Sequence, residues 1–379
     1  MVINPEINGR EHTQSKDASA KGRDMTFHLN ILTHFSLKLL VIGGCMSLIG
    51  LPAFAQAVDK VDLSGVKLTI GIQAASSSAS VALVEASDVF QDTPYELEWA
   101  HFSGANAAVE ALQAGALDVN IGLNFSAPVL NQANANVPWT LEDRPYVIVG
   151  ANHQTSRGGI GLVVAAESDI RTINDLAGGS VSFARGTVNH YFFALAAKQA
   201  GLDLEAVKLV LMPLAEARAA FIGGAVDSLV TSVLNARPLV RSGDGRMIAT
   251  SEGLFDTYHW IVARPEVLKD AEKEAAVADI LVRLQQLNVW QAENPDKVAE
   301  IYETVARQHP DDARLTAQES FTQLVPIDEA VIAANQSQAD VFFDAGVAAT
   351  LINASIGFDP RFNAVVAANP VPAHLQLAQ

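Results

Sequence analysis

The stretch ELEWAHFSGANAAVEALQAGALDVNIGL, residues 96–123, contains a complete strand–helix–strand pattern. Glu96–Trp99 alternates polar and apolar residues, as a half-buried strand does. Ser103-Gly104-Ala105-Asn106 then leads into a helix over Ala107–Ala114, with Gly115 as its C-cap. A second strand follows at 118–123. A unit of this kind predicts parallel strands joined by a helix that covers one face of the sheet.

The same alternation extends in both directions along the chain. Before the quoted unit, the sequence predicts a strand at 66–72 and a helix from Ser76–Ser78 to about Phe90; after it, a helix at 126–135 and a strand at 146–149. A polar, Gly-rich connection, 153–159, opens a second block. Its predicted strands are 161–165, 180–183, 208–211 and 227–231, and its helices are 173–176, 189–200 and 216–221. A strand at 257–263 leaves this block, and the chain beyond it is predicted to be helical at 266–294, with a break near Asp270, at 296–306 and at 328–345.

Composition excludes several classes of protein. The chain has 379 residues, 49% of them hydrophobic, which is enough for two domains with sizeable cores. The net charge of -17 argues against nucleic acid as the main partner, because neutralising phosphates needs clustered Lys and Arg. The one cysteine, Cys45, excludes an internal disulfide and any cysteine-based metal site.

The N-terminal region has the pattern of an export signal. His28, His34 and Lys38 precede an apolar run at 39–51, and Ala53-Phe54-Ala55-Gln56-Ala57 offers two small-x-small cleavage sites. We expect export to the periplasm with cleavage near Ala55 or Ala57, and translation starting at Met1 or Met25. The alternative is a lipoprotein anchored at Cys45. Removing residues 1–57 leaves 20 basic and 38 acidic residues, a net charge of about -18.

Templates for catalysis and metal binding are missing from the sequence. We find no G-x-x-x-x-G-K-[ST] loop, no G-x-G-x-x-G opening a helix, no G-x-S-x-G elbow and no H-E-x-x-H. The histidines of the exported part are scattered, and Asp311-Asp312 beside Pro310 is predicted to be a solvated turn. The sequence therefore predicts no cofactor, no metal and no catalytic residues.

The remaining polar signals follow predicted strands. In an open α/β sheet, ligands bind beyond the carboxyl ends of the strands, where helix N-termini present free N–H groups. Four loops have this placement, and each of them could instead simply cap its helix: Gln73–Ser78, Phe102–Gly104, Gly122–Asn124 and Phe183–His190. The last supplies Arg185, Gly186 and His190 within six residues. Four such loops in two blocks predict a small-molecule cleft between two domains.

Several motifs in order resemble one family. Residues 101–118 are similar to the F-x-S-G…E-A-L-x-A-G-x-x-D signature of periplasmic binding proteins for sulfonates, taurine and nitrate. The resemblance continues in Ser168–Gly178, which matches S-x-I-x-(S/T)-(V/I)-x-D-L-x-G, in Arg185-Gly186-Thr187 with His190-Tyr191, and in Ala220–Asp227. It covers residues 66–265 well and the remainder loosely.

The resemblance implies a fold, a function and a set of ligand contacts. The implied fold is the two-lobed α/β periplasmic binding protein fold (type II), with a mixed, mostly parallel sheet flanked by helices in each lobe. The implied function is to capture a small anionic organic compound between the lobes and deliver it to the permease of an ABC importer, as a monomer that is not itself a membrane protein. The contacts carried over by position are Gln73, Ser76, Ser103, Gly104, Asn124, Arg185, Thr187, Asn189, His190 and Thr231. We further expect Phe102 and Leu229 to cover the organic part of the ligand with apolar surface.

One departure from the family concerns the ligand. Alkanesulfonate binders tend to have V-D-A-W-x-x-W-D-P where this chain has Val226-Asp227-Ser228-Leu229-Val230-Thr231-Ser232-Val233-Leu234. Smaller side chains replace an aromatic wall, so sulfonate, taurine, nitrate, a sulfate ester and a heterocycle all stay open. Two further functions also stay open: an enzyme of the same fold, similar to desulfinases or pyrimidine-synthesising enzymes, and a ligand-sensing module.

The expected domain boundaries follow from this organisation. Residues 1–57 form the N-terminal extension and signal peptide, 64–155 the first part of lobe 1, and 156–255 lobe 2. Residues 256–360 return to lobe 1, and 361–379 are a tail. The chain is expected to cross between the lobes near Ala151–Gly161 and Gly253–Val262, where Gly and polar residues flank β-branched runs.

Overall fold

The computed structural model describes residues 61–73, 77–102, 104–154, 159–319 and 321–375, without the side chains of residues 73, 77 and 78. The export signal expected in residues 1–57 lies outside these ranges, as do Ser76 and Ser103.

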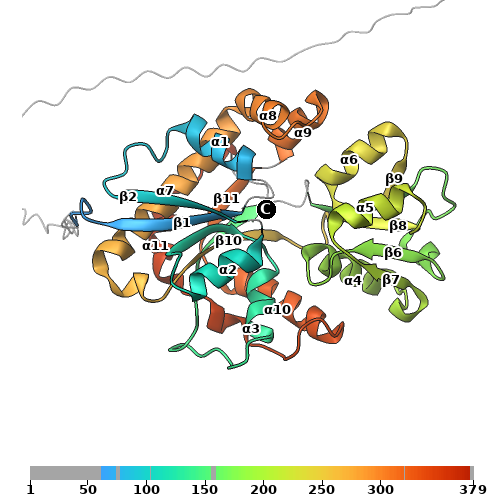
Figure 1. Cartoon of the computed structure of the whole chain (residues 1–379), viewed down its shortest axis with the longest axis horizontal. Helices are drawn as coiled ribbons and strands as arrows, with labels where there is room; N and C mark the ends of the chain where they lie inside the picture. Colours follow the sequence, from blue (N-terminus) through green and yellow to red (C-terminus); the bar gives the residue numbers. More distant parts are fainter. Residues whose placement is uncertain (1–60, 74–76, 103, 155–158, 320, 376–379) are drawn as a thin grey trace, which may run out of the picture. The chain divides into compact units, whose positions relative to one another are not determined.

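The first sheet carries the strands from both ends of the described chain (Figure 1). Its strand order is β11-β4-β10-β3-β1-β2. The strands are β1 (Lys67–Gln73), β2 (Glu96–Phe102), β3 (Val119–Leu123), β4 (Val147–Gln154), β10 (Thr257–Ala263) and β11 (Thr322–Val325). The central β1 is parallel to β2 and β3, as the quoted strand–helix–strand unit predicts. The antiparallel pairs are β10 with β3 and β4, and β11 with β4.

The second sheet has the order β7-β6-β8-β5-β9. Its strands are β5 (Ile160–Ala165), β6 (Ser180–Phe183), β7 (Lys208–Leu211), β8 (Ser228–Ser232) and β9 (Gly245–Thr250). Strand β6 is parallel to β7 and β8, whereas β5 is antiparallel to β8 and β9. The chain enters this sheet between Gln154 and Ile160 and leaves it between Thr250 and Thr257. We call the two sheets with their helices the first and second lobes.

Helices cover both sheets. Those of the second lobe are α4 (Val188–Ala200), α5 (Leu214–Ile222) and α6 (Val233–Ser242). Those of the first lobe are α1 (Ser77–Ser87), α2 (Ala105–Gln113), α3 (Ala127–Ala133), α7 (Ala271–Glu293), α8 (Pro295–Thr304), α9 (Pro310–Glu319), α10 (Glu329–Asp344) and α11 (Asn363–Ala368). The predicted helix at 173–176 is the 3₁₀ turn η2 (Ile173–Leu176).

Both faces of the first sheet are buried. Along β10, Trp260 and Val262 pack into one core cluster, and Ile261 and Ala263 pack into the cluster on the opposite face. Successive side chains of a strand point to opposite faces, so a continuous apolar run is what a strand covered on both faces requires. The second lobe has smaller clusters on each side of β8, where Val230 packs on one side and Leu229 on the other.

The helix break predicted near Asp270 is confirmed. The Asp270 carboxylate accepts hydrogen bonds from the backbone N–H groups of Glu272 and Lys273, at 3.0 and 3.1 Å, and so caps α7. The strand predictions at 208–211 and 257–263 match β7 and β10 residue for residue.

The turn predicted at Asp311-Asp312 is wrong. These residues form the first turn of α9, and Asp312 is buried, where it pairs with Arg241 of α6. The sequence patterns also failed to predict α6 and β9, and β11 within the region predicted to be helical. Pro238 lies inside α6, and an internal proline argues against a helix when only the sequence is available. Residues 361–375, assigned to a tail, contain α11 and contribute Phe362 and Val366 to the core.

Candidate functional site

The carboxyl ends of the parallel strands of the first lobe lie at one edge. Gln73 and Phe102 are register partners at the ends of β1 and β2. Gly104 stands at the N-cap of α2 in an extended conformation, directly after this edge. Asn124 follows β3, and its Oδ1 accepts a hydrogen bond of 3.0 Å from the Ser126 backbone N–H. The amide of Asn124 is therefore already engaged in the turn that starts α3.

The second lobe repeats this arrangement with three helices. Strands β6, β7 and β8 run parallel, and α4, α5 and α6 begin shortly after their carboxyl ends. Each helix leaves its first backbone N–H groups without intrahelical partners, and together with the helix dipole these favour an anion. At α6 the Ser232 hydroxyl accepts a hydrogen bond from the Asn235 backbone N–H at 3.2 Å.

A hollow of about 360 Å³ opens among β8, α5 and α6. Its lining is Leu214, Ala215, Arg218, Leu229, Thr231 and Asn235. Thr231 is fully buried, and among the residues that the structure describes its hydroxyl has no hydrogen-bond partner. The Arg218 guanidinium donates one hydrogen bond of 3.1 Å to the Asn235 backbone oxygen. A buried polar group without a partner costs free energy, and a ligand or water molecule that reached this hydroxyl would supply the missing partner.

The alternation of β8 explains two members of this lining. Leu229 and Thr231 lie two residues apart and so share a face, while Val230 packs into the core on the other side. The sequence motifs single out Leu229 and Thr231 but give no indication of Arg218 and Asn235. Arg218 could have been predicted from the repeated strand–helix pattern, because that pattern requires a helix directly after β7. Arg218 lies four residues after the first residue of α5, on the same face of the helix.

The Arg185–His190 loop follows β6, contacts the first lobe, and is not among the residues that line the hollow. An Nη of Arg185 donates a hydrogen bond to the backbone oxygen of Gly346, just after α10. Thr187 donates its hydroxyl to the Ala184 backbone oxygen at 2.8 Å. Gly186 has a φ of +70°, and a Cβ there would lie 2.7 Å from a methyl group of Leu130 on α3. Any other residue at 186 would be strained in its backbone and would collide with α3.

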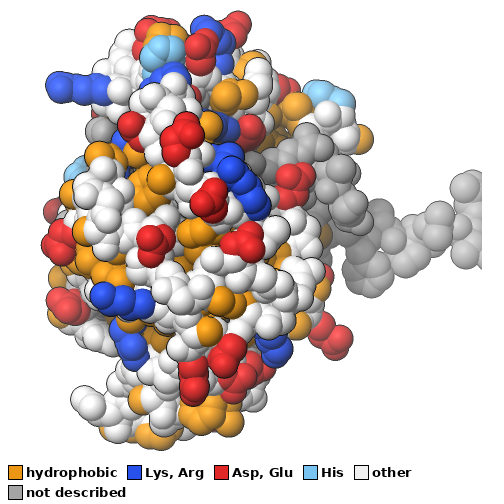
Figure 2. Space-filling view, turned by 90° about the vertical axis from the view of Figure 1, so that its right-hand side faces the viewer, with side chains coloured by type: hydrophobic (Ala, Val, Ile, Leu, Met, Phe, Trp, Pro, Cys, Tyr) orange, Lys and Arg blue, Asp and Glu red, His pale blue; other side chains and the backbone are white. Residues whose placement is uncertain are grey.

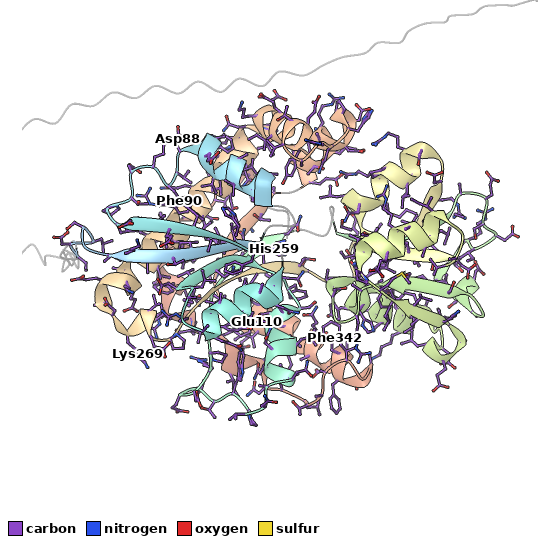
Figure 3. All side chains as sticks on the ribbon, in the orientation of Figure 1. Asp88, Phe90, Glu110, His259, Lys269 and Phe342 are labelled. Atoms are coloured by element: carbon purple, nitrogen blue, oxygen red, sulfur yellow. The ribbon has the colours of Figure 1, made fainter. Side chains whose placement is uncertain are left out.

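His190 is an interior residue of this contact. It is buried, with its ring centroid 5.0 Å from that of Phe183 and 5.9 Å from that of Phe342. Phe342 lies on α10 (Figure 3). Its Nδ1 accepts a hydrogen bond of 3.3 Å from the Gly186 backbone N–H. Burial, with a smaller contribution from the Arg185 charge, lowers the pKa of His190 to about 4. The imidazole is therefore neutral at pH 7. Asn189, beside it in the first turn of α4, is half-buried.

Other site types are not seen among the described residues. Within the described ranges, His, Asp and Glu form no group of three that could hold a metal ion. None of the helices in those ranges is both long and apolar enough to span a bilayer. On the face shown in Figure 2, the basic side chains of the described residues are scattered singly or in small groups among acidic and uncharged ones. That face offers no broad basic surface for nucleic acid.

Comparison with known proteins gives consistent matches. Residues 102–276 match the family model described as NMT1/THI5 like. A curated relative, the putative aliphatic sulfonates-binding protein of Escherichia coli (strain K12), is 25% identical over 313 residues, which are 81% of this chain and 91% of the relative. The crystal structure of the periplasmic aliphatic sulphonate binding protein SsuA from Escherichia coli matches with a TM-score of 0.68 and 21% identity, over 78% of this chain and 92% of that one.

This chain has the periplasmic binding protein fold. A second periplasmic binding protein, the alkanesulfonate-binding SsuA from Xanthomonas axonopodis pv. citri bound to MOPS, has a TM-score of 0.65 and 20% identity, over 77% of this chain and 98% of that one. The periplasmic nitrate-binding protein NrtA from Synechocystis PCC 6803 matches with a TM-score of 0.59 and 14% identity, over 82% of this chain and 91% of that one. The resemblance found in the sequence and the two-lobed α/β fold are thereby confirmed. The four relatives or structures named here are binding proteins by their descriptions.

Proposed function

We propose that this chain is the extracytoplasmic solute-binding component of an ABC importer and that it captures a small anionic organic compound of the sulfonate class. The family match, the named relatives and the two-lobed fold support this role. In it the protein binds and releases the compound unchanged, and the permease is its protein partner. We propose that it acts as a monomer.

The hollow in the second lobe is the observation that carries the ligand class. Arg218 supplies a fixed positive charge, and the unmet Thr231 hydroxyl supplies a neutral donor. The N-termini of α5 and α6 add oriented backbone N–H groups. Leu214, Ala215 and Leu229 give apolar surface beside these donors, which suits a compound with an anionic head and a short organic tail.

The remaining contacts of the proposed site lie at the facing strand ends. From the first lobe we propose Gln73, Ser76, Phe102, Ser103, Gly104 and Asn124. From the second lobe, Arg185, Thr187, Asn189 and His190 stay as proposed contacts alongside Leu229 and Thr231. Arg218 lines the hollow, whereas Arg185 and His190 are not among its lining residues, so we place Arg218 first as the partner of the anion.

Calorimetry tests the ligand class. We expect ethanesulfonate, taurine or methyl sulfate to bind the purified protein, and ethylamine and ethanol, which match them in size without the anionic head, to give no heat of binding. Binding by only the cationic or uncharged compounds would overturn the proposal. Nitrate in the same panel separates an inorganic anion from an organic one, because only the organic anions use the apolar wall.

The proposed location is the periplasm, with the signal peptide removed near Ala55 or Ala57. N-terminal sequencing of periplasmic protein should find a start at Gln56 or Val58. A mature protein that retains residues 25–50, or that carries a lipid on Cys45, would contradict this location.

A further inference from the structure

Two ion pairs join α6 of the second lobe to α9 of the first. Arg237 pairs with Glu319, and Arg241 pairs with Asp312. The two arginines are one helical turn apart on α6 and therefore lie on one face of that helix. The two carboxylates are two turns apart on α9 and likewise lie on one face. The two helices are thus joined by two ion pairs.

Three of the four side chains in these ion pairs are partly buried, and the fourth, Arg241, is 40% exposed. The side chains of Arg237 and Asp312 are each 11% exposed, and that of Glu319 is 26% exposed. Water screens such partly buried charges less than the exposed pairs found elsewhere on α9. The second Nη of Arg237 is buried and has no hydrogen-bond partner within the described ranges, so losing Glu319 would leave its charge still less compensated.

Helix α6 is also a wall of the hollow. Its N-cap, Ser232, directly follows Thr231, and Asn235 lines the hollow and accepts the hydrogen bond from Arg218. Arg237 is only two residues beyond Asn235. A shift of α6 would therefore move the helix N-terminus and the oxygen that orients the Arg218 guanidinium. Helix α9 is held in the first lobe by its packing against α7 and α8.

We propose that Asp312 and Glu319 are positioning residues for ligand binding, acting on the hollow through Arg241 and Arg237. This inference rests on the proposed function, because the hollow has to be the ligand site for the effect on affinity to follow. Neither carboxylate touches the hollow. Their effect is to hold α6 where its N-terminus and Arg218 face a bound anion.

The first measurement is the affinity for ethanesulfonate by calorimetry. Glu319→Gln should weaken it about tenfold, which is ~1.4 kcal/mol. The matched control is Asp311→Asn, which removes the exposed pair between Asp311 and Arg314 on the same helix and should leave the affinity unchanged. Arg237→Lys keeps the positive charge but loses the planar guanidinium with its paired N–H donors. This variant should therefore fold and should weaken binding by less than Glu319→Gln. This variant keeps the proposal testable if Glu319→Gln fails to fold.

The second measurement needs no ligand. Residues 58–379 contain no cysteine, so spin labels at Val305→Cys and Ile222→Cys, both exposed, report the distance between the end of α8 and α5 in the mature protein. Glu319→Gln should broaden or lengthen this distance in the free protein, and Asp311→Asn should not. Distances and affinities that are the same in both variants would overturn the positioning role. A changed distance with no ethanesulfonate binding by any variant would instead overturn the proposed ligand class.

Discussion

Two strand-to-helix junctions of the second lobe differ in which of their polar groups have hydrogen-bond partners in the fold. Residues 183–190 join β6 to α4 and contain a cation, a glycine, two hydroxyl or amide caps and a histidine. Residues 229–235 join β8 to α6 and contain no charged residue and no histidine. Yet the first junction satisfies Arg185, Thr187 and His190 with protein partners, whereas the second leaves the buried Thr231 hydroxyl unmet. A polar loop is available to a ligand only where the fold leaves its groups unpaired.

Apolar packing explains the difference. Tyr191 of α4 is buried against the first lobe, with ring centroids 6.2 Å from Phe125 and 6.3 Å from Phe342. Its hydroxyl lies 3.0 Å from the Ser337 hydroxyl on α10. This contact brings the N-terminus of α4 against α3 and α10. The contact between α6 and α9 is instead made by ion pairs, and the hollow lies next to it.

The largest expected effect is that of removing the apolar contact. Tyr191→Ala should lower the free energy of unfolding by about 3–5 kcal/mol, the range for deleting a large buried aromatic side chain. Urea denaturation followed by circular dichroism measures it. Tyr191→Phe keeps the ring and loses only the hydrogen bond to Ser337, so it should cost about 0.5–1.5 kcal/mol. Equal costs for the two variants would show that the ring packing does not hold α4 in place.

Arg218 and Arg185 give the sharpest contrast in ligand binding. Arg218→Ala should weaken ethanesulfonate binding by about 1.5–3 kcal/mol, the range for a hydrogen bond to a charged group. Arg185→Ala should have a smaller effect, because Arg185 is not among the residues that line the hollow. Calorimetry on both variants measures the difference. The reverse ranking would move the anion site to the β6–α4 junction.

The buried His190 should make stability depend on pH. The unfolded chain has the ordinary histidine pKa of 6.5, and burial lowers the pKa in the folded state to about 4. The unfolded state therefore binds an additional proton between these values, and stability falls as pH decreases through this window. One proton corresponds to at most ~1.4 kcal/mol per pH unit.

His190→Gln is the control for this effect, since glutamine can still accept the hydrogen bond from Gly186 and does not titrate. Urea denaturation at several pH values between 4 and 7 should show a shallower slope for the variant than for the wild type. His259, whose pKa burial also lowers, contributes equally to both proteins. Parallel slopes would mean that His190 is not titrating from a buried, neutral state.

The smallest effect tests the unmet hydroxyl. Thr231→Val has nearly the same shape and should weaken ethanesulfonate binding by about 0.5–1.5 kcal/mol, the value of one neutral hydrogen bond. The same change should leave the free energy of unfolding unchanged or raise it, because a buried group without a protein partner is removed. Loss of stability together with unchanged affinity would show that the hydroxyl serves the fold and not the ligand. Calorimetry and urea denaturation on one preparation give both values.

The strand and helix pattern was largely predictable because it follows from short-range properties. The β-branched run at 257–263 predicts β10, and the Asp270 cap predicts the start of α7. The errors occur where a tertiary contact outweighs the local signal. Asp311-Asp312 beside a proline suggests a solvated turn, but in the fold Asp312 pairs with Arg241, 71 residues away in the chain, and the segment is helical. Helix α6 likewise forms despite its internal Pro238.

The sequence by itself determined the α/β class, the family resemblance and the strand ends at which polar groups collect. These depend on residue periodicity and on motifs that are contiguous along the chain. Only the tertiary structure decided which of those groups have protein partners. Arg185 finds the Gly346 oxygen 161 residues away, and Arg218 stands beside Thr231 because α5 and β8 enclose one hollow. Such pairings depend on how separate elements pack, and no local pattern of residues specifies them.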